Sequence, residues 1–156
     1  MHVQGDDIAW YREIETTKVK GPDGYLYEPV WMAPEDAEAR GIKNGDIVKV
    51  YNERGIILTG ARISQRITPG SVVVAKGSRV DPIAPHIDRG GAINLISPEA
   101  TVSKNCKGFA VTGYLIEAEK LTQEEYDSWK KDYPEAFNRA YDAGQGITRD
   151  AWVVGA

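Results

Sequence analysis

Short β-favouring stretches separated by tight-turn signals restrict this chain to a small set of folds. Residues 47–51 alternate Val48 and Val50 with Lys49, residues 56–67 form a longer β-rich stretch, and residues 71–75 form a third. Gly, Asn or Pro punctuate the chain between them. Few strands of this kind, with one short helix between them in 156 residues, predict a small closed barrel rather than a layered α/β fold.

The segments beside these strands also carry local patterns. Residues 34–41 begin with Pro, continue with acidic side chains and end with Gly, which predicts a short helix. Residues 111–119 predict a last strand. The side chains expected to point into the barrel are those of Val48, Val50, Val72, Val74 and Leu115.

The two ends of the chain differ from this β-rich part. Residues before about 27 show no period, which suggests an extended segment. Thr122 and Glu125 have the spacing of a capping box, and Pro134 is expected to divide the following residues into two short helices. The aromatic residues there are interpreted as packing residues of a docking tail, namely Tyr126, Trp129, Tyr133, Phe137 and Tyr141.

Composition excludes several classes of function. The net charge of −4 argues against a nucleic-acid partner, because phosphate neutralisation requires clustered Lys and Arg. No apolar run approaches the ~20 residues of a membrane-spanning helix. Cys106 is the one cysteine, so this segment holds neither a disulfide nor a cysteine-ligated cluster. His2 and His86 lack zinc-ligand spacing, so we expect no metal site built from this chain.

Residues 76–108 are dense in Gly, Asp, Arg, Ser and Asn and show no regular period. A segment of that length and polarity is either binding surface or disorder. If other parts of a larger protein complete such a binding surface, we expect residues 77–108 to be mobile in this chain alone.

The run of residues 31–50, followed by Arg54-Gly55 and Thr68-Pro69-Gly70, resembles the molybdopterin-dinucleotide-binding domain at the C-terminus of the dimethyl sulfoxide reductase superfamily. The resemblance covers residues 31–119. Residues 88–98 resemble the loop that meets the cofactor, with Ser97 where Thr is commoner. Residues 2–14 and 88–91 are similar to large subunits of the pyrogallol–phloroglucinol transhydroxylase type.

This resemblance implies a mainly β fold, a six-stranded double-psi β-barrel with short helices and a C-terminal helical tail. Residues 1–30 would be an extended segment entering from an upstream domain, residues 31–120 the barrel and residues 121–156 the tail. The implied cofactor is molybdopterin guanine dinucleotide carrying Mo or W. Its metal ligand would lie upstream, so the implied partners are upstream domains of the same polypeptide and an iron–sulfur subunit of the holoenzyme, and this piece alone would not be active. The resemblance favours the cytoplasm over the periplasm.

The resemblance also supplies a set of cofactor-binding residues with fitting chemistry. Asn94 offers a donor and an acceptor at once, and Asp88 accepts from a guanine or a ribose. Gly90 and Gly91 permit close backbone approach, and Arg89 is available to a pyrophosphate. The full set is Asn94, Asp88, Arg89, Gly90, Gly91, Lys104 and His2, with no catalytic or metal-ligating residue among them.

Competing hypotheses remain at this point. Asp88 and Arg89 could form a solvated loop pair. The chain could also be a free-standing double-psi barrel that binds a protein or a small molecule without molybdenum, because fold does not settle function. A small hydrolase is disfavoured, since no serine lies in a nucleophile elbow and neither histidine has an evident acidic partner. The length and polarity of residues 77–108 favour cofactor binding over a plain scaffold.

Overall fold

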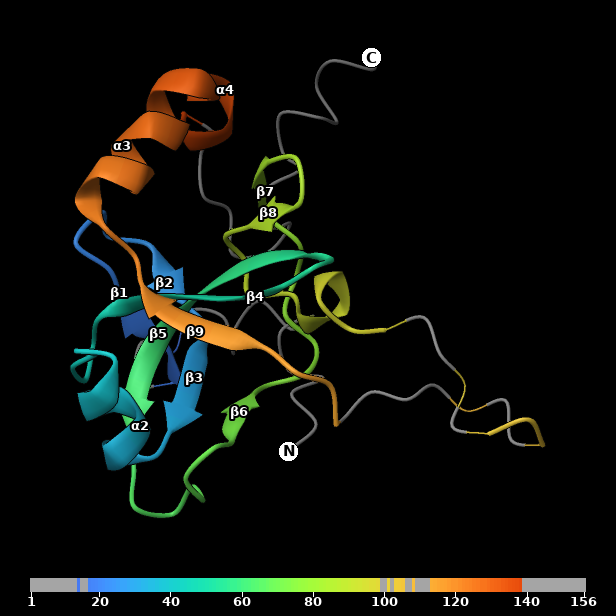
Figure 1. Ribbon diagram of the computed structural model, residues 1–156. Coiled ribbons are helices and arrows are strands. Elements are labelled where there is room, and N and C mark those ends of the chain that lie inside the picture. Colours follow the sequence, from blue (N-terminus) through green and yellow to red (C-terminus); the bar gives the residue numbers. More distant parts are fainter. Residues whose placement is uncertain are drawn as a thin grey trace.

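A mixed β-sheet dominates the computed structural model, which describes residues 14, 17–98, 101, 103–105, 108 and 113–138 (Figure 1). The main path of the sheet has the order β6-β3-β5-β4-β9, and β8 pairs with β5 beside this path. The strands of the path are β3 (Pro29–Met32), β4 (Ile47–Asn52), β5 (Gly55–Ile63), β6 (Val72–Val74) and β9 (Glu117–Lys120). The described chain is therefore mainly β, as the sequence predicts.

The β4–β5 hairpin organises the sheet. Val48 lies opposite Thr59 in this antiparallel pair, and β9 then pairs with the other edge of β4, where Ala118 lies opposite Val50. On the far side of β5, β3 runs parallel to it and β6 runs antiparallel to β3. Because Val48 and Val50 are buried while Lys49 between them is not, the alternation read from the sequence is confirmed.

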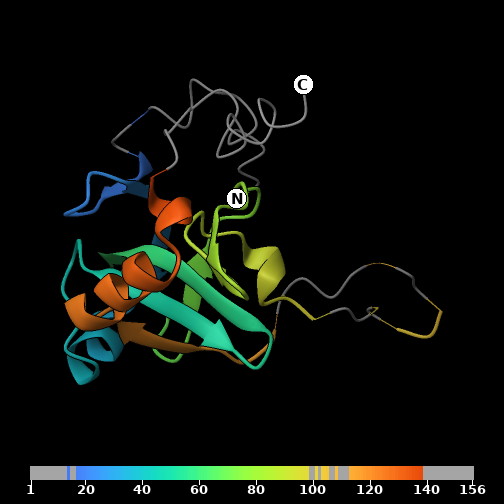
Figure 2. The same ribbon diagram turned by 90° about the horizontal axis from the view of Figure 1, so that it is seen from above.

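Strand β5 is covered on both faces. Ile57 and Ala61 belong to a first core with side chains of β3, β4 and α2 (Pro34–Ala39), and Leu58 belongs to a second core on the opposite face. The second core receives the C-terminal helices α3 (Gln123–Asp132) and α4 (Pro134–Phe137). Figure 2 shows these two helices toward one end of the β4–β5 ribbon.

The local signals at the helices are confirmed. α2 starts with Pro34 and ends just before Arg40, and Thr122 and Glu125 form a reciprocal capping box. Pro134 begins α4, with only Tyr133 between it and the end of α3. Three of the five tail aromatics pack in the second core, namely Trp129, Tyr133 and Phe137. Tyr126 is buried and packs edge-on against Phe137. Tyr141 lies outside the described residues.

A small antiparallel hairpin precedes the main sheet. It consists of β1 (Val19–Lys20) and β2 (Leu26–Tyr27), and Tyr27 packs in the second core. Gly60 of β5 lies so close to Val19 that an added Cβ would be 2.2 Å from the Val19 Cβ. This glycine therefore lets the hairpin rest directly on β5.

Three details of the sequence prediction need correction. The last strand begins at Glu117, and Leu115 is 92% exposed while its neighbours Tyr114 and Ile116 pack against the first core. Buried and exposed side chains thus alternate as expected, but Leu115 lies on the exposed face and not on the buried one. A shift of a strand by one residue exchanges its two faces in this way. Residues 76–98 are also not wholly irregular, since they contain β7 (Pro82–Ala84), β8 (Ile87–Asp88) and the 3-10 helix η3 (Ile93–Leu95).

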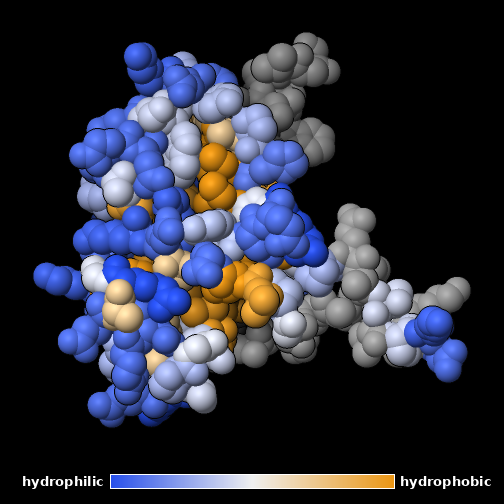
Figure 3. All heavy atoms as spheres, in the orientation of Figure 1, coloured by the Kyte–Doolittle hydropathy of each residue, from blue (hydrophilic) through white to orange (hydrophobic). Residues whose placement is uncertain are grey.

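The closed barrel is not present among the described strands, since β6 and β9 form two separate ends of the path. Both ends nevertheless line one hollow of about 410 Å³. Its walls include Met32, Val72, Tyr114, Ile116 and Ala118. Figure 3 shows hydrophobic residues gathered in a depression on this face, at the level of β6 and the start of β9 in Figure 1.

Within the described residues, no helix has the length and apolar character required to cross a membrane.

Candidate functional site

Asp88, at the end of β8, ties residues 81–92 into a closed loop. Its side chain is buried, and its carboxylate accepts the backbone N–H of Asp81 at 2.5 Å and that of Ala92 at 2.6 Å. Burial raises the pKa of Asp88, although the backbone N–H groups favour its charged form. Its oxygens are therefore directed into the loop and away from solvent.

Arg89 turns inward as well. Its Nε donates to Asp81 Oδ2 at 3.1 Å, and Nη2 lies 3.0 Å from the same oxygen. The guanidinium carbon lies 4.3 Å from the ring centroid of Tyr25 and 5.4 Å from that of Phe137. Burial opposes the charged guanidinium, but Asp81, Tyr25 and Tyr27 together outweigh it and the pKa of Arg89 is raised. Asp88 and Arg89 are thus not a solvated pair, and the partner of Arg89 is Asp81.

Gly90 and Gly91 do permit close approach, but the atoms that approach belong to this chain. A Cβ added to Gly90 would lie 2.0 Å from the carbonyl oxygen of Arg79. At Gly91, which has φ +76°, a Cβ would lie 2.8 Å from the Cβ of Glu28. Both glycines are required by the internal packing of the loop.

Asn94 is the predicted residue that faces outward. It is exposed in η3, between Ile93 and Leu95, which pack against the first core. Ile96 is buried next to them, and its carbonyl accepts from Asn52 Nδ2 at 2.8 Å. Within the described part of the chain, no hydrogen bond is formed by the Asn94 side chain. The short helix is therefore anchored by its packed neighbours, while the Asn94 amide faces solvent.

The 3-10 helix is held from two further directions. Gly55, at the start of β5, lies against Leu95 so closely that an added Cβ would be 2.8 Å from its Cγ. Ser97 donates to the carbonyl of Ile93 at 2.9 Å, and its hydroxyl lies 3.2 Å from that of Tyr114. Ser97, the departure from the family pattern noted above, thus has a structural contact here.

The other two predicted residues are not brought to this helix. Lys104 is exposed in the short stretch 103–105, which both views draw away from the body of the molecule (Figures 1 and 2). His2 lies outside the described residues. Of the seven sequence-predicted residues, five therefore lie in one loop, and Asn94 alone among them is exposed.

Two residues of this region escape sequence reasoning. Asp81 is 2% exposed and pairs with Arg89 across eight residues, a contact for which the sequence offers no signal beyond an acid in the same irregular segment. Ser78 has a buried hydroxyl oxygen that finds no hydrogen-bond partner among the described residues. Ser78 precedes Arg79 in the sequence, and the backbone of Arg79 lies against Gly90.

The arrangement suits binding rather than catalysis by side chains. It offers an exposed amide on a buried ionic support, and no group of three metal-ligating side chains occurs among the described residues. Such a donor set fits a ligand with both donors and acceptors on a planar edge, because an amide satisfies the two together.

Comparison with known proteins agrees with this chemistry. The family model described as "Molydopterin dinucleotide binding domain" matches residues 8–113, which is more than half of the chain and includes the loop that carries Asn94.

Three curated relatives are each much longer than this chain. The large subunit of pyrogallol hydroxytransferase from Pelobacter acidigallici is 36% identical over 131 residues, 81% of this chain and 15% of the relative. A dimethyl sulfoxide reductase of Haemophilus influenzae is 32% identical over 77% of this chain and 14% of its own length. A trimethylamine-N-oxide reductase of Salmonella typhimurium is 48% identical over 61% of this chain and 12% of its own length.

Proposed function

Because the chain belongs to the molybdopterin dinucleotide binding domain family, we propose that its loop 88–97 presents Asn94 to a molybdopterin guanine dinucleotide bound in a larger oxidoreductase or transhydroxylase subunit. The observation that carries this proposal is the exposed, unpaired amide of Asn94 on a helical turn whose neighbours are buried. An amide held in this way can bond a guanine or pterin edge in both directions.

The residues present fit that group. A guanine dinucleotide carries a base edge, ribose hydroxyls and a pyrophosphate, so its site requires amide and hydroxyl groups on a loop that stays in place. Asn94 supplies the amide on such a loop. When bound, the metal–pterin unit supplies the redox or hydroxyl-transfer chemistry, and this chain's residues position it.

The individual residues divide into two roles in this proposal. Asn94 contacts the cofactor, and Lys104 and His2, from separate segments, bind its anionic groups. Asp88, Arg89 and the two glycines act indirectly, by holding the loop that carries Asn94. The inward orientation of Asp88 and Arg89 supports this division, because buried paired charges are poorly placed to meet a ligand.

We also propose that the complete barrel is a six-stranded double-psi barrel over residues 31–120, flanked by an N-terminal segment 1–30 and a tail 121–156. In support, the two ends of the sheet line the same hollow and pack against the same core. The rest of the parent subunit would enclose the cofactor together with this barrel, and an iron–sulfur subunit is a partner of the holoenzyme. A free-standing module without molybdenum is not favoured, since the matching family model describes a molybdopterin dinucleotide binding domain and the relatives are much longer enzymes.

The experiment tests Asn94 with guanosine diphosphate, which carries a guanine, a ribose and a pyrophosphate. Titration followed by amide chemical shifts is expected to perturb residues 88–97 at millimolar concentration, because half of the enclosing site is missing. Asn94→Leu is expected to weaken binding by about 1–3 kcal/mol, since it leaves polar ligand groups unpaired. Its melting temperature should stay within about 3 °C, because an exposed residue contributes little to the core.

Asn138→Leu is the matched control, an exposed asparagine at the end of α4 that should leave guanosine diphosphate binding unchanged. Equal binding by wild type and Asn94→Leu would remove Asn94 from the site. In the intact enzyme the same substitution is expected to lower bound molybdenum or tungsten and activity together.

A further inference from the structure

Arg89 is the point at which three separate segments of the chain meet. It follows β8, its guanidinium lies over Tyr25 of the N-terminal hairpin region, and it also faces Phe137 of α4. Helix α4 contacts β7 as well. The C-terminal helices therefore touch the loop that carries Asn94 through a defined buried cation.

A chain of hydrogen bonds runs from this cation to η3. Arg89 pairs with the Asp81 side chain, and its backbone N–H donates to the Asp81 carbonyl at 2.8 Å. The Asp81 N–H donates to Asp88, whose second oxygen accepts from Ala92 at 2.6 Å. The Ala92 carbonyl then accepts from Leu95 at 3.0 Å, which closes the turn around Asn94.

The aromatic contact at the start of this chain is itself braced. The ring of Phe137 packs edge-on against Tyr126 with 5.3 Å between centroids, and the Tyr126 hydroxyl donates to Asp23 at 2.5 Å. Asp23 also accepts the hydroxyl of Tyr27 and the backbone N–H of Tyr25. The helices, the hairpin and Arg89 thus form one packed unit on the second core.

We propose that Arg89 is a positioning residue through which the docked helix α4 holds Asn94 in its binding orientation. The proposal rests on the function proposed above, because it takes Asn94 as the cofactor contact. A cation between two aromatic faces is stabilised by both, so removing one face loosens the cation and the loop that it anchors. A preorganised loop binds its ligand more tightly, because less conformational freedom is lost on binding.

The test compares three variants of the full chain by amide hydrogen exchange. Phe137→Leu removes the aromatic face and keeps an apolar side chain, whereas Phe137→Tyr keeps the face. Thr122→Ala is the matched control, because it weakens the start of α3 through its capping box and touches nothing at Arg89.

In Phe137→Leu, exchange of the Arg89, Ala92 and Leu95 amides is expected to rise roughly three- to thirtyfold, while the amides of β4 and β5 are unchanged. Phe137→Tyr should restore slow exchange, and Thr122→Ala should leave these three amides as in wild type. A uniform rise across the sheet in Phe137→Leu, or an equal rise in Thr122→Ala, would show a general loss of stability and overturn the proposal. Unchanged loop exchange in Phe137→Leu would overturn it too.

Guanosine diphosphate titration separates positioning from packing. Its affinity is expected to fall about threefold or more in Phe137→Leu and to recover in Phe137→Tyr. Faster loop exchange with unaltered affinity would contradict the positioning role. If guanosine diphosphate perturbs no residue of loop 88–97 even in wild type, the proposed function fails, whereas the exchange result still decides whether α4 holds the loop.

Discussion

At the scale of single residues, the charged side chains of the candidate loop serve the loop itself. Both carboxylate oxygens of Asp88 accept hydrogen bonds from backbone N–H groups, and the guanidinium of Arg89 pairs with Asp81 and contacts two aromatic rings. Burying these groups is tolerable because each is paired and hydrogen-bonded. Asn94, which is neutral, is the one left facing solvent among the five predicted residues of this loop.

Asp88→Asn tests this internal role. An amide nitrogen cannot accept, so one of the N–H groups of Asp81 and Ala92 would face a donor inside the protein. We expect a loss of about 1–3 kcal/mol in the free energy of unfolding, measured by urea denaturation. Asp127→Asn on the exposed face of α3 is the control and should change it by less than about 0.5 kcal/mol. Equal stability of the two variants would mean that the Asp88 contacts contribute nothing net.

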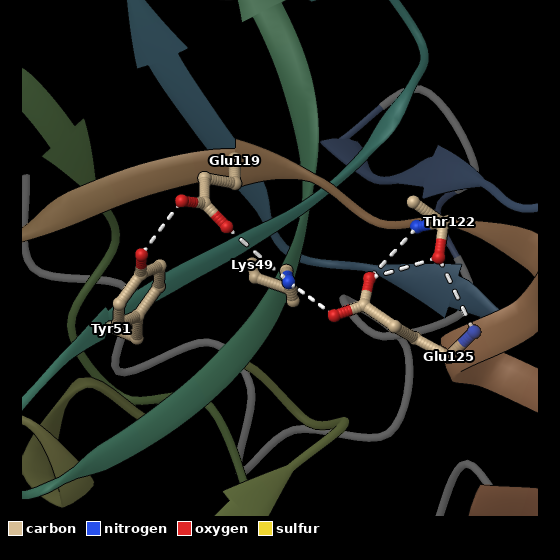
Figure 4. Close-up of polar contacts among 5 residues, drawn as sticks. All are labelled: Lys49, Tyr51, Glu119, Thr122 and Glu125. Atoms are coloured by element: carbon tan, nitrogen blue, oxygen red, sulfur yellow. Dashed lines mark hydrogen bonds and ion pairs between the residues drawn. The ribbon is translucent and has the colours of Figure 1, made fainter. Parts of the chain in front are cut away.

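At the scale of secondary-structure elements, one lysine joins three of them. Figure 4 shows Lys49 of β4 between Glu119 of β9 and Glu125 of α3. Its Nζ lies 2.5 Å from a Glu125 oxygen and 3.4 Å from a Glu119 oxygen. Because Glu125 also completes the capping box with Thr122, the start of α3 is attached to the sheet where β9 leaves it.

These contacts make the stability of the fold depend on pH in the acidic range. Burial opposes the charged form of Glu125, but Lys49 and the Thr122 N–H outweigh it and lower its pKa below 4.5. The Tyr51 hydroxyl and Lys49 lower the pKa of Glu119. A carboxylate with a lowered pKa stabilises the fold above its unfolded-state pKa, and this contribution is lost as the pH falls through the lower, folded-state value. Stability should therefore decline as the pH falls below about 4.5.

Glu125→Gln removes one of these carboxylates. We expect its melting temperature to be about 2–4 °C below that of wild type at pH 7, a modest effect because the pair is partly exposed. The difference should shrink as the pH falls below about 4.5 and through the lowered pKa of Glu125, because wild-type Glu125 then becomes protonated. Glu124→Gln, an exposed neighbour in the same turn, should match wild type at pH 7 and at low pH. A difference that persists at low pH would assign the loss to helix packing.

At the scale of the whole molecule, the sheet curls so that its two ends contribute to one core. Val72 of β6 and Ile116, just before β9, both pack against the first core and line the same hollow. The described strands leave this hollow between the ends of the path. The barrel proposed above would complete the structure there.

Paired substitutions in the chain leading to β9 test this arrangement. Ile116→Asp is expected to cost about 2–4 kcal/mol, because it places a charge against the first core. Leu115→Asp should cost less than about 0.5 kcal/mol, because that side chain is 92% exposed. Urea denaturation of both variants measures the difference. The reverse order would return Leu115 to the barrel interior and restore the phase expected from sequence.

The features that the sequence determined by itself are local or belong to a family pattern. The helix at Pro34, the capping box at Thr122 and the break at Pro134 depend on residues within one turn of each other, so their signals are complete in a short window. The alternation of Val48 and Val50 about Lys49 similarly reports a strand with one buried face. The run of residues 31–50 and the loop 88–98 carried the resemblance to the cofactor-binding family, which the family match over residues 8–113 supports.

The tertiary structure decided which side chains meet and which face solvent. In the sequence, Arg89 has the chemistry of an anion-binding side chain. Asp81, Tyr25 and Phe137 surround it only when the loop, the hairpin and α4 pack together. Whether the Leu115 side chain faces the core or solvent depends on where β9 begins to pair with β4. No local propensity determines that point. Burial is a property of contacts between residues far apart in the chain, and it divides the loop into a buried ionic support and an exposed Asn94.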